Sequence, residues 1–187
     1  MLKKDLRQQY KNFRNQFTFN DIMNDSLVIA NQCLSLPVWD KTYFHLFLPI
    51  EKLKEINTEF LLQILAGKDK EIVVSKSDFE TFEMTHFLLT DNTKIKTNDF
   101  GIPEPVDGIE VPVSKIEVVF VPLLAYDVLG NRVGYGKGFY DKFLQQCHAN
   151  TIKIGLSFFE PEAKIDDVIA QDIALDYCVT PDAIYKF

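Results

Sequence analysis

An apolar run that leads into a glycine-rich loop constrains this chain more than any other feature. Residues 118–122 are apolar and end at a proline, and Gly134, Gly136 and Gly138 later occupy every second position. Because glycine has no Cβ, such a backbone can adopt positive φ and lie close against a ligand. Helix-compatible sequence resumes at Phe139, and the amides of a loop followed by a helix converge on a concavity that favours anions. The order strand, loop, helix therefore predicts an anion-binding site.

Charged side chains in and after this loop favour phosphate as the anion. Arg132 offers a planar fork of donors and Lys137 a mobile point charge. Asp141 lies one turn inside the expected helix, where a carboxylate can hold a Mg²⁺ ion that is shared with phosphates. A plain surface loop is the alternative, but the two embedded cations make it the weaker interpretation. Neither the P-loop pattern nor the dinucleotide fingerprint is present, because Gly138 follows Lys137 and the glycines are spaced G-x-G-x-G.

Composition limits the class of protein. Of 187 residues, 47% are hydrophobic, so we expect one domain with one core over residues 1–187. The net charge of −7 argues against nucleic acid as the main partner. No apolar run approaches the ~18 residues of a membrane span, and charges begin at Lys3, so neither a span nor a signal peptide is expected. The cysteines lack any CxxC pair, which favours thiols in a reducing cytoplasm. We interpret His45, His86 and His148 as satisfied structural side chains.

The N-terminal residues predict an amphipathic helix over residues 2–17. Its basic face carries Lys3, Arg7 and Lys11 at a spacing of four. Like charges at this spacing repel one another, and cations near a helix start oppose the macrodipole. A bound polyanion would offset both penalties. A solvated basic face is the alternative, and from this helix alone it is slightly favoured.

The rest of the chain alternates between strands and helices. We expect helices over residues 20–36 (capped by Asn20), from Asn57 or Thr58 to residue 66, and from 139 to about 150. We expect strands over residues 43–48, 71–75, 84–89, 118–122, 152–158 and 177–180. A mixed connection over residues 161–170 could include a short helix. Several strands are apolar without alternation, which indicates a sheet covered on both faces. The predicted fold class is therefore α/β, a single three-layer α/β/α domain with a mostly parallel central sheet.

Two segments outside the loop could contribute to a binding site. The link after the first expected strand carries Ile50, Glu55 and Asn57, and in α/β sheets ligands sit at the carboxyl ends of strands. The prolyl segment around Phe100 and Glu104 cannot be the interior of a helix. It is either a linker or a wall of the site.

Several separated segments form a recognisable set of motifs. They are Lys3-Lys4-Asp5-Leu6-Arg7; Phe47-Leu48-Pro49 with Glu55-Ile56-Asn57-Thr58; Phe100-Gly101-Ile102-Pro103-Glu104-Pro105; the stretch from Pro122 to Asp141; and Asp176 with Val179-Thr180-Pro181. In this order they resemble the 5-formyltetrahydrofolate cyclo-ligases, also called methenyltetrahydrofolate synthetases. The resemblance covers essentially the whole chain, and its most specific block runs from Arg132 to Asp141.

The resemblance implies that ATP and 5-formyltetrahydrofolate give 5,10-methenyltetrahydrofolate, ADP and phosphate. The formyl oxygen would attack the γ-phosphate, and N10 would then close onto the activated carbon as phosphate leaves. Such chemistry requires mainly alignment and electrostatic stabilisation from the protein. We therefore expect a cytoplasmic monomer that uses Mg²⁺ and binds only small molecules.

The resemblance also assigns roles to residues. ATP would be bound by Lys3, Lys4, Arg7, Arg132, Val133, Gly134, Tyr135, Gly136, Lys137, Gly138, Phe139 and Tyr140, with Arg132 and Lys137 as the catalytic residues. Folate would be bound by Ile50, Glu55, Asn57, Phe100, Glu104 and Tyr140, and the metal by Asp141 and Asp176.

From the loop alone, two alternatives stay open. One is another ATP- or sugar-phosphate-dependent enzyme on the same fold, such as a small kinase or an isomerase. The other is a non-catalytic ATP-binding protein. Folate-dependent turnover of ATP would separate all three.

Overall fold

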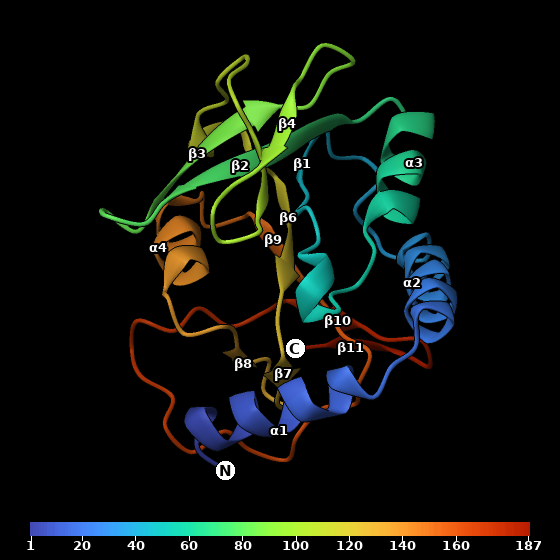
Figure 1. The fold of residues 1–187 in the computed structure, drawn as a ribbon, viewed down its shortest axis with the longest axis vertical. Coiled ribbons are helices and arrows are strands. Elements are labelled where there is room, and N and C mark those ends of the chain that lie inside the picture. The colour runs from blue at the N-terminus through green and yellow to red at the C-terminus, as the bar shows by residue number, and fades with distance from the viewer.

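The computed structural model describes residues 1–187 and is built around a seven-stranded sheet. Its strands are β1 (Tyr43–His45), β2 (Glu71–Asp78), β3 (Glu83–Leu88), β6 (Val118–Pro122), β9 (Ile152–Leu156), β10 (Tyr177–Val179) and β11 (Ile184–Lys186). In space they follow the order β11-β10-β9-β6-β1-β2-β3 (Figure 1). The inner strands are parallel, whereas β3 and β11 form antiparallel edges. The sheet is therefore mostly parallel, as predicted.

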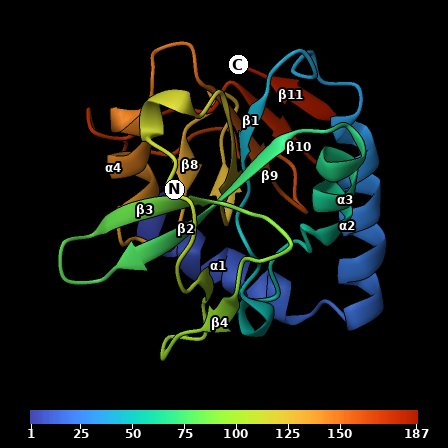
Figure 2. The ribbon, with the colours of Figure 1, turned by 90° about the horizontal axis from the view of Figure 1, so that it is seen from above.

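Helices cover both faces of this sheet. α2 (Phe19–Cys33) and α3 (Glu59–Gly67) pack on one face and α4 (Phe139–Gln146) on the other (Figure 2). Successive side chains of a strand point to opposite faces. In β6, Val118 joins the core beneath α2 and α3, and Val119 joins the core beneath α4. An uninterrupted apolar strand thus has cover on both sides, and the three-layer α/β/α prediction is confirmed.

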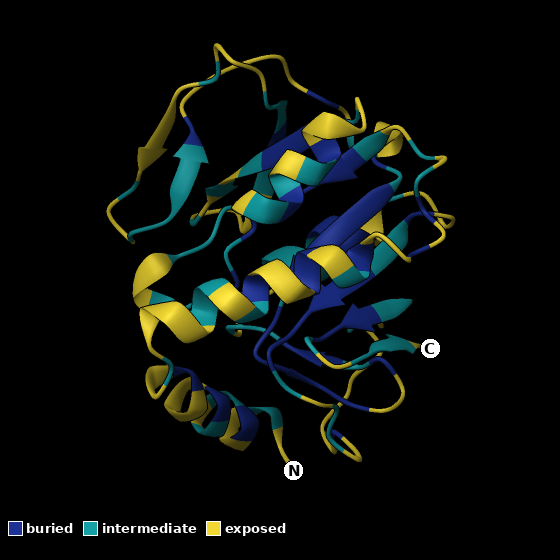
Figure 3. Cartoon of the chain, turned by 90° about the vertical axis from the view of Figure 1, so that its right-hand side faces the viewer, coloured by how far each residue is buried: buried dark blue, intermediate teal, exposed yellow.

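The N-terminal helix α1 (Lys3–Asn15) lies across the end of the sheet at which β6 finishes (Figure 1). There it packs on a short hairpin of β7 (Ala125–Tyr126) and β8 (Arg132–Val133). Leu6 and Tyr10 of α1 are buried in a core cluster with residues of this hairpin. The opposite side of the helix is exposed (Figure 3). The helix is therefore held beside the start of the glycine loop.

Shorter elements lie in the connections. β4 (Ile95–Thr97) pairs with β5 (Pro103–Pro105), and the 3-10 helices η1 (Glu51–Leu53) and η2 (Val113–Lys115) precede α3 and β6. No helix of the structure has the length and apolar character needed to cross a membrane.

Several element boundaries differ from the sequence prediction. Thr18, not Asn20, caps α2, because its hydroxyl accepts the Asp21 amide while the Asp21 carboxylate accepts the Thr18 amide. The connection over 161–170 contains no helix, and α4 ends at Gln146, several residues earlier than expected. Strands β4, β5 and β11 form although the sequence did not predict them. They are short and depend on pairing with other strands, which local propensity does not indicate.

Candidate functional site

A cavity of about 440 Å³ opens beside the carboxyl ends of β1 and β6. This volume is typical of small-molecule sites. We call the part lined by Lys3, Arg7, Arg132, Gly134, Gly136, Lys137, Gly138, Asp141 and Asp172 the glycine-loop side, and the part lined by His45, Ile50, Glu55, Ser75, Phe79, Phe100, Phe139 and Tyr140 the aromatic side. Tyr135, from the glycine loop itself, also lines the cavity.

The glycine loop is shaped by backbone conformation and fixed by α1. Gly136 has φ +89° and Gly138 has φ +79°, a region that L side chains rarely adopt. The Nε of Arg7 donates to the Gly134 carbonyl at 2.9 Å. A Cβ on Gly136 would lie 3.2 Å from the Arg7 guanidinium carbon, so the guanidinium packs against this glycine. The basic face of α1 is therefore docked on the loop, and the solvated-face interpretation does not describe Arg7.

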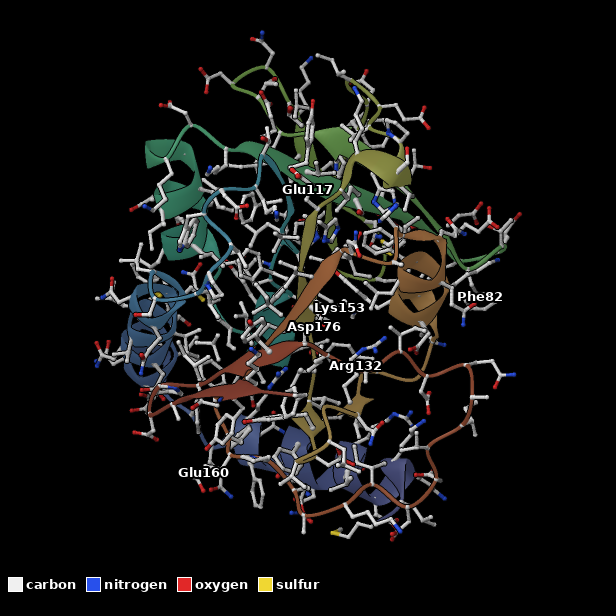
Figure 4. All side chains as sticks on the ribbon, turned by 180° about the vertical axis from the view of Figure 1, so that it is seen from behind. Phe82, Glu117, Arg132, Lys153, Glu160 and Asp176 are labelled. Carbon is white, nitrogen blue, oxygen red and sulfur yellow. The ribbon has the colours of Figure 1, made fainter.

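The two cations of the loop have different environments. Arg132 (labelled in Figure 4) is 8% exposed. Its Nη2 donates to Asp141 Oδ1 at 2.6 Å, and its Nη1 donates to the Ile173 carbonyl. Lys137 is exposed and forms no ion pair. Arg132 thus orients Asp141, whereas the ammonium of Lys137 is available to a ligand.

Asp141 and Asp172 are the two carboxylates of the glycine-loop side. Asp172 Oδ2 accepts from the Lys3 ammonium and from the Ile169 amide. Burial raises the pKa of Asp172, but these two donors outweigh it and the pKa is lowered below its usual value. Asp141 Oδ1 accepts from Arg132 and from the Ile173 amide. In each carboxylate, one oxygen has donors and the second has no hydrogen-bond partner, so two carboxylate oxygens are available here.

Asp176 does not belong to this pair, contrary to the sequence prediction. Its Oδ2 lies 2.8 Å from the Lys153 ammonium and accepts the Lys153 amide at 2.7 Å (Figure 4). It does not line the cavity. The reason is topological, because Asp176 precedes β10 and so lies where β9 and β10 begin, whereas ligand sites form where parallel strands end.

A second hollow of about 390 Å³ adjoins the glycine-loop side. Its wall is polar, with Ile169 as the single hydrophobic residue, and it includes Lys142, Gln145 and Gln171. The two hollows share Lys3, Arg7, Gly136, Gly138, Asp141 and Asp172. The glycine loop therefore lies at the junction between an open polar hollow and a deeper, more apolar one.

The aromatic side has a wall of phenylalanine rings. Phe79 and Phe100 stack with centroids 4.2 Å apart, and Phe79 meets Phe139 edge to face at 5.0 Å. Phe100 is 58% exposed, so one face of this wall is open to a planar ligand. Such rings prefer offset or edge contacts with other π systems.

Glu55 is the buried carboxyl group of the aromatic side. It is 6% exposed, its Oε2 accepts the Ile50 amide at 2.7 Å, and its Oε1 accepts the Tyr135 hydroxyl at 2.6 Å. Burial raises the pKa of Glu55 above its usual value, and these two hydrogen bonds oppose the rise without cancelling it. A carboxylate has about four acceptor positions, so Glu55 can accept further hydrogen bonds from a ligand.

His45 lies at the floor of the aromatic side, and His86 lies behind it, outside the cavity lining. Ser75 Oγ bridges His45 Nε2 and His86 Nδ1 at 2.7 Å each. The prediction of satisfied histidines is wrong for this pair, because His45 Nδ1 and His86 Nε2 are buried without partners. His148 is exposed, and its Nδ1 accepts the Asn150 amide at 3.2 Å. Burial lowers the pKa of His86 to about 4 and the pKa of His45 well below its usual value, so both rings are neutral near pH 7.

Four of the residues predicted for the nucleotide or folate do not reach the cavity. Lys4 is exposed beside it, and Val133 is buried beneath the loop. Asn57 is turned toward α2 and α3, where its side chain contacts Met23 and accepts the Glu59 amide. Glu104 lies in the β4–β5 hairpin and does not line the cavity. Proximity in sequence to a site residue therefore did not place these side chains in the site.

The structure adds residues that the sequence prediction omitted. They are Lys11, His45, Ser75, Phe79 and Asp172, all of which line the cavity. The spacing of four with Lys3 and Arg7 was a signal for Lys11. No local pattern marks the other four, because strand pairing brings His45 and Ser75 together and the course of the connections places Phe79 and Asp172.

Comparisons with known proteins match this arrangement to one family. The model of the 5-formyltetrahydrofolate cyclo-ligase family matches residues 1–179. A 5-formyltetrahydrofolate cyclo-ligase of Escherichia coli (strain K12) is 35% identical over 138 residues, which are 71% of this chain and 75% of that protein. Another, of Haemophilus influenzae, is 35% identical over 111 residues, which are 56% of this chain and 58% of that protein. The NMR structure of Aquifex aeolicus 5,10-methenyltetrahydrofolate synthetase has a TM-score of 0.84 at 26% identity, covering 100% of this chain and 93% of that one.

Proposed function

Because the chain belongs to the 5-formyltetrahydrofolate cyclo-ligase family, we propose that it converts 5-formyltetrahydrofolate and ATP to 5,10-methenyltetrahydrofolate, ADP and phosphate. One observation carries this proposal. A single cavity joins an anion-binding glycine loop to an aromatic wall with a buried carboxylate. A reaction between a nucleotide and a planar heterocycle needs both features in one site.

The glycine-loop side would bind ATP. The nucleoside would occupy the polar second hollow, and the triphosphate would cross the junction that Lys3, Arg7 and the loop glycines line. Loop amides, the amino end of α4 and the free Lys137 ammonium would hold the phosphates. Arg132, which is already bonded to Asp141 and Ile173, would act by fixing the carboxylate and the loop. The catalytic charge closest to the transferred group would then be that of Lys137.

The aromatic side would bind the folate. The pterin is planar and would stack on the open ring face beside Phe79 and Phe100. Its ring N–H and amino donors need acceptors, and an ionised carboxylate accepts hydrogen bonds without competing as a donor. In its ionised form, Glu55 would be such an acceptor, held by Ile50 and Tyr135. Tyr140, which lines the cavity and meets His45 edge to face, would form the inner boundary.

The proposed reaction has two steps. The formyl oxygen attacks the γ-phosphorus and ADP leaves, giving a phosphorylated imidate. N10 then attacks the activated carbon, the five-membered ring closes, N10 releases its proton to solvent, and phosphate leaves. The chain would align the two substrates and stabilise the negative charge of the transferred phosphoryl group with loop amides and Lys137. Water must be kept from the imidate, and the phenylalanine wall supports that role.

A magnesium ion fits the residues of the glycine-loop side. Mg²⁺ usually binds through one or two carboxylates together with substrate phosphates and water. Asp141 and Asp172 both line the junction of the two hollows and each has an oxygen without a partner. These two residues would hold the ion, which would neutralise phosphate charge when bound.

The same observations support a simple setting for the enzyme. We propose that the chain acts as a monomer and as one domain over residues 1–187. Cys33 and Cys178 are buried free thiols, which supports a reducing, cytoplasmic location. The net charge of −7 supports small molecules rather than nucleic acid as partners.

The experiment that tests the proposal is formation of the methenyl chromophore in the near ultraviolet. Protein, Mg-ATP and 5-formyltetrahydrofolate are mixed, with matched reactions that lack ATP, lack folate or contain a non-hydrolysable ATP analogue. We expect the chromophore in the complete mixture alone, with one ADP formed per methenyl product. ATP turnover without folate, or binding of both without product, would contradict the proposal.

A further inference from the structure

Arg14 belongs to none of the sequence motifs, yet it is a buried cation beside the cavity. It occupies the last turn of α1 and is 3% exposed. Its Nη1 donates to the Tyr135 hydroxyl at 2.8 Å, and its Nη2 donates to the Leu123 carbonyl. The Nε has no partner. A buried guanidinium with an incomplete set of acceptors is costly, so its position calls for a compensating role.

Tyr135 extends this contact to the aromatic side. Its hydroxyl accepts from Arg14 and donates to Glu55 Oε1 at 2.6 Å. Glu55 in turn accepts the Ile50 amide. Tyr135 stands between Gly134 and Gly136 in the glycine loop, so a single side chain of the phosphate-binding loop holds the buried carboxylate of the other side.

The charges around Glu55 make Arg14 the cation that matters most for its ionisation. Burial raises the pKa of Glu55, while the hydrogen bonds from Tyr135 and Ile50 and the charge of Arg14 lower it. Tyr140 faces Glu55 from α4 and is neutral, because burial raises its pKa far above the physiological range. Lys54, which follows η1, is turned away and donates to the carbonyls of Asn15 and Phe17. Removal of Arg14 or of the Tyr135 hydroxyl therefore favours the protonated carboxyl.

Resting on the proposed function, we propose that Arg14 and Tyr135 are positioning residues that keep Glu55 ionised and directed toward the folate, and so make folate recognition depend on the placement of the glycine loop. Neither residue needs to touch a substrate for this effect. A nucleotide that orders the loop then also orders Tyr135 and Glu55, and by linkage each substrate increases the affinity for the other.

The test compares Tyr135→Phe, Arg14→Gln and Arg14→Lys with the wild-type enzyme. The measured quantity is the pH dependence of kcat/KM for 5-formyltetrahydrofolate at saturating Mg-ATP, since its acidic limb reports the essential base of the enzyme before folate binds. Tyr10→Phe is the matched control. It removes a tyrosine hydroxyl on the same helix that bonds to Glu162 at 2.7 Å and does not line the cavity.

We expect the acidic limb to move upward by about one pH unit in Tyr135→Phe and in Arg14→Gln, with KM for folate raised. Because the coupling is reciprocal, KM for ATP at saturating folate should also rise in Tyr135→Phe. Arg14→Lys keeps the charge and should restore most of the shift, and Tyr10→Phe should leave the limb in place. The two shifts should be less than additive in the double variant, because both substitutions act on one carboxylate. Folate affinity, measured with and without a non-hydrolysable ATP analogue, should lose its dependence on the nucleotide in Tyr135→Phe.

Loss of kcat with an unmoved acidic limb would overturn the inference, since that result describes a purely structural role. An unchanged nucleotide dependence of folate affinity in a folded Tyr135→Phe protein would also overturn it. Should Arg14→Gln fail to fold, Tyr135→Phe alone decides both points. Failure of the proposed function looks different, because the wild-type enzyme would then form no methenyl product at any pH.

Discussion

The glycine-loop side of the cavity consists mainly of backbone amides and charged side chains, among which Lys137 is exposed, whereas the aromatic side combines the exposed ring of Phe100 with the buried polar side chains of Glu55 and His45. Lys137 is exposed and unpaired, while Glu55, His45 and His86 are all buried. The first side can lose a charge without disturbing a core. The second cannot, because each polar atom there depends on a neighbour that has no access to water. We therefore expect variants of the two sides to separate activity from stability.

The largest effect is expected for Lys137→Ala on the glycine-loop side. Loss of the unpaired cation should reduce kcat/KM for ATP by roughly 10²-fold or more, which corresponds to about 3 kcal/mol of transition-state stabilisation. The melting temperature should stay close to that of the wild-type protein, because the side chain is exposed and forms no ion pair. Steady-state kinetics and thermal unfolding of the same preparation check both parts. Lys186→Ala, an exposed lysine of β11, is the control, and activity within twofold of wild type for Lys137→Ala would remove Lys137 from the site.

Changes beside the aromatic side should instead alter the free energy of unfolding, because the two buried histidines are neutral. The pKa of His86 falls from 6.5 to about 4 on folding. Below pH 6.5 the unfolded chain therefore binds a proton that the folded one does not, and stability is lost as the pH falls from about 6.5 toward 4. The expected contribution of His86 is roughly 3 kcal/mol over this window.

His86→Gln isolates this contribution from that of the carboxylates. The free energy of unfolding, measured by denaturant at a series of pH values, should fall less steeply with acid in the variant than in the wild-type protein. Parallel curves for the two proteins would show that folding does not lower the pKa of His86, so that it takes up its proton at the same pH in both states. The description of the aromatic side would then be wrong.

A smaller effect is expected for Asp141→Asn, which returns to the glycine-loop side. The amide oxygen can still accept from Arg132 and Ile173, so the loop should stay in place. The lost charge should raise the Mg²⁺ concentration for half-maximal activity by about tenfold. Asp176→Asn is the matched control, because Asp176 is paired with Lys153 outside the cavity. Equal metal dependence of the Asp141 variant and the wild-type enzyme would exclude Asp141 as a metal ligand.

The smallest effect is expected for Phe100→Ala. This variant tests whether the exposed ring of the aromatic side contributes to folate binding without contributing to stability. Phe100 is 58% exposed and stacks on Phe79. Its removal should raise KM for folate several-fold, about 1 kcal/mol, and leave KM for ATP and the melting temperature unchanged. Phe19→Ala, at 73% exposure on α2, controls for loss of an exposed ring. A larger change for ATP than for folate would reverse the assignment of the two sides.

The glycine-loop side was largely predictable from the sequence, and the physical reason is locality. Glycines that need positive φ and the cations between them are adjacent in the chain, so a short motif specifies most of that side. Lys3 and Arg7 were assigned to the site by the family resemblance, whereas the charges of the helix alone slightly favoured a solvated face. Asp172 was missed and Asp176 chosen in its place, because the course of the loop between them cannot be inferred from composition.

The aromatic side was predictable only in part. Glu55 and Phe100 belong to motifs, but His45 and Ser75 come from the paired strands β1 and β2, and Phe79 lies in the turn after β2. His45 and His86 were interpreted as fully hydrogen-bonded structural residues because their apolar neighbours indicate burial. The sequence cannot show whether each ring nitrogen of a buried histidine has a hydrogen-bond partner. The same distinction holds for the fold. Long apolar strands such as β6 were predicted correctly, whereas short edge strands such as β11 form only through pairing.

Equilibrium binding of Mg-ATP to the wild-type protein and to Lys137→Ala, measured by calorimetry without folate, tests the central claim most directly. The claim is that loop amides and Lys137 form the phosphate site. We expect one nucleotide per chain for the wild-type protein and at least tenfold weaker binding for the variant, with folate binding in the absence of nucleotide unchanged. No measurable affinity of the wild-type protein for Mg-ATP, or equal affinity of the two proteins, would contradict the account.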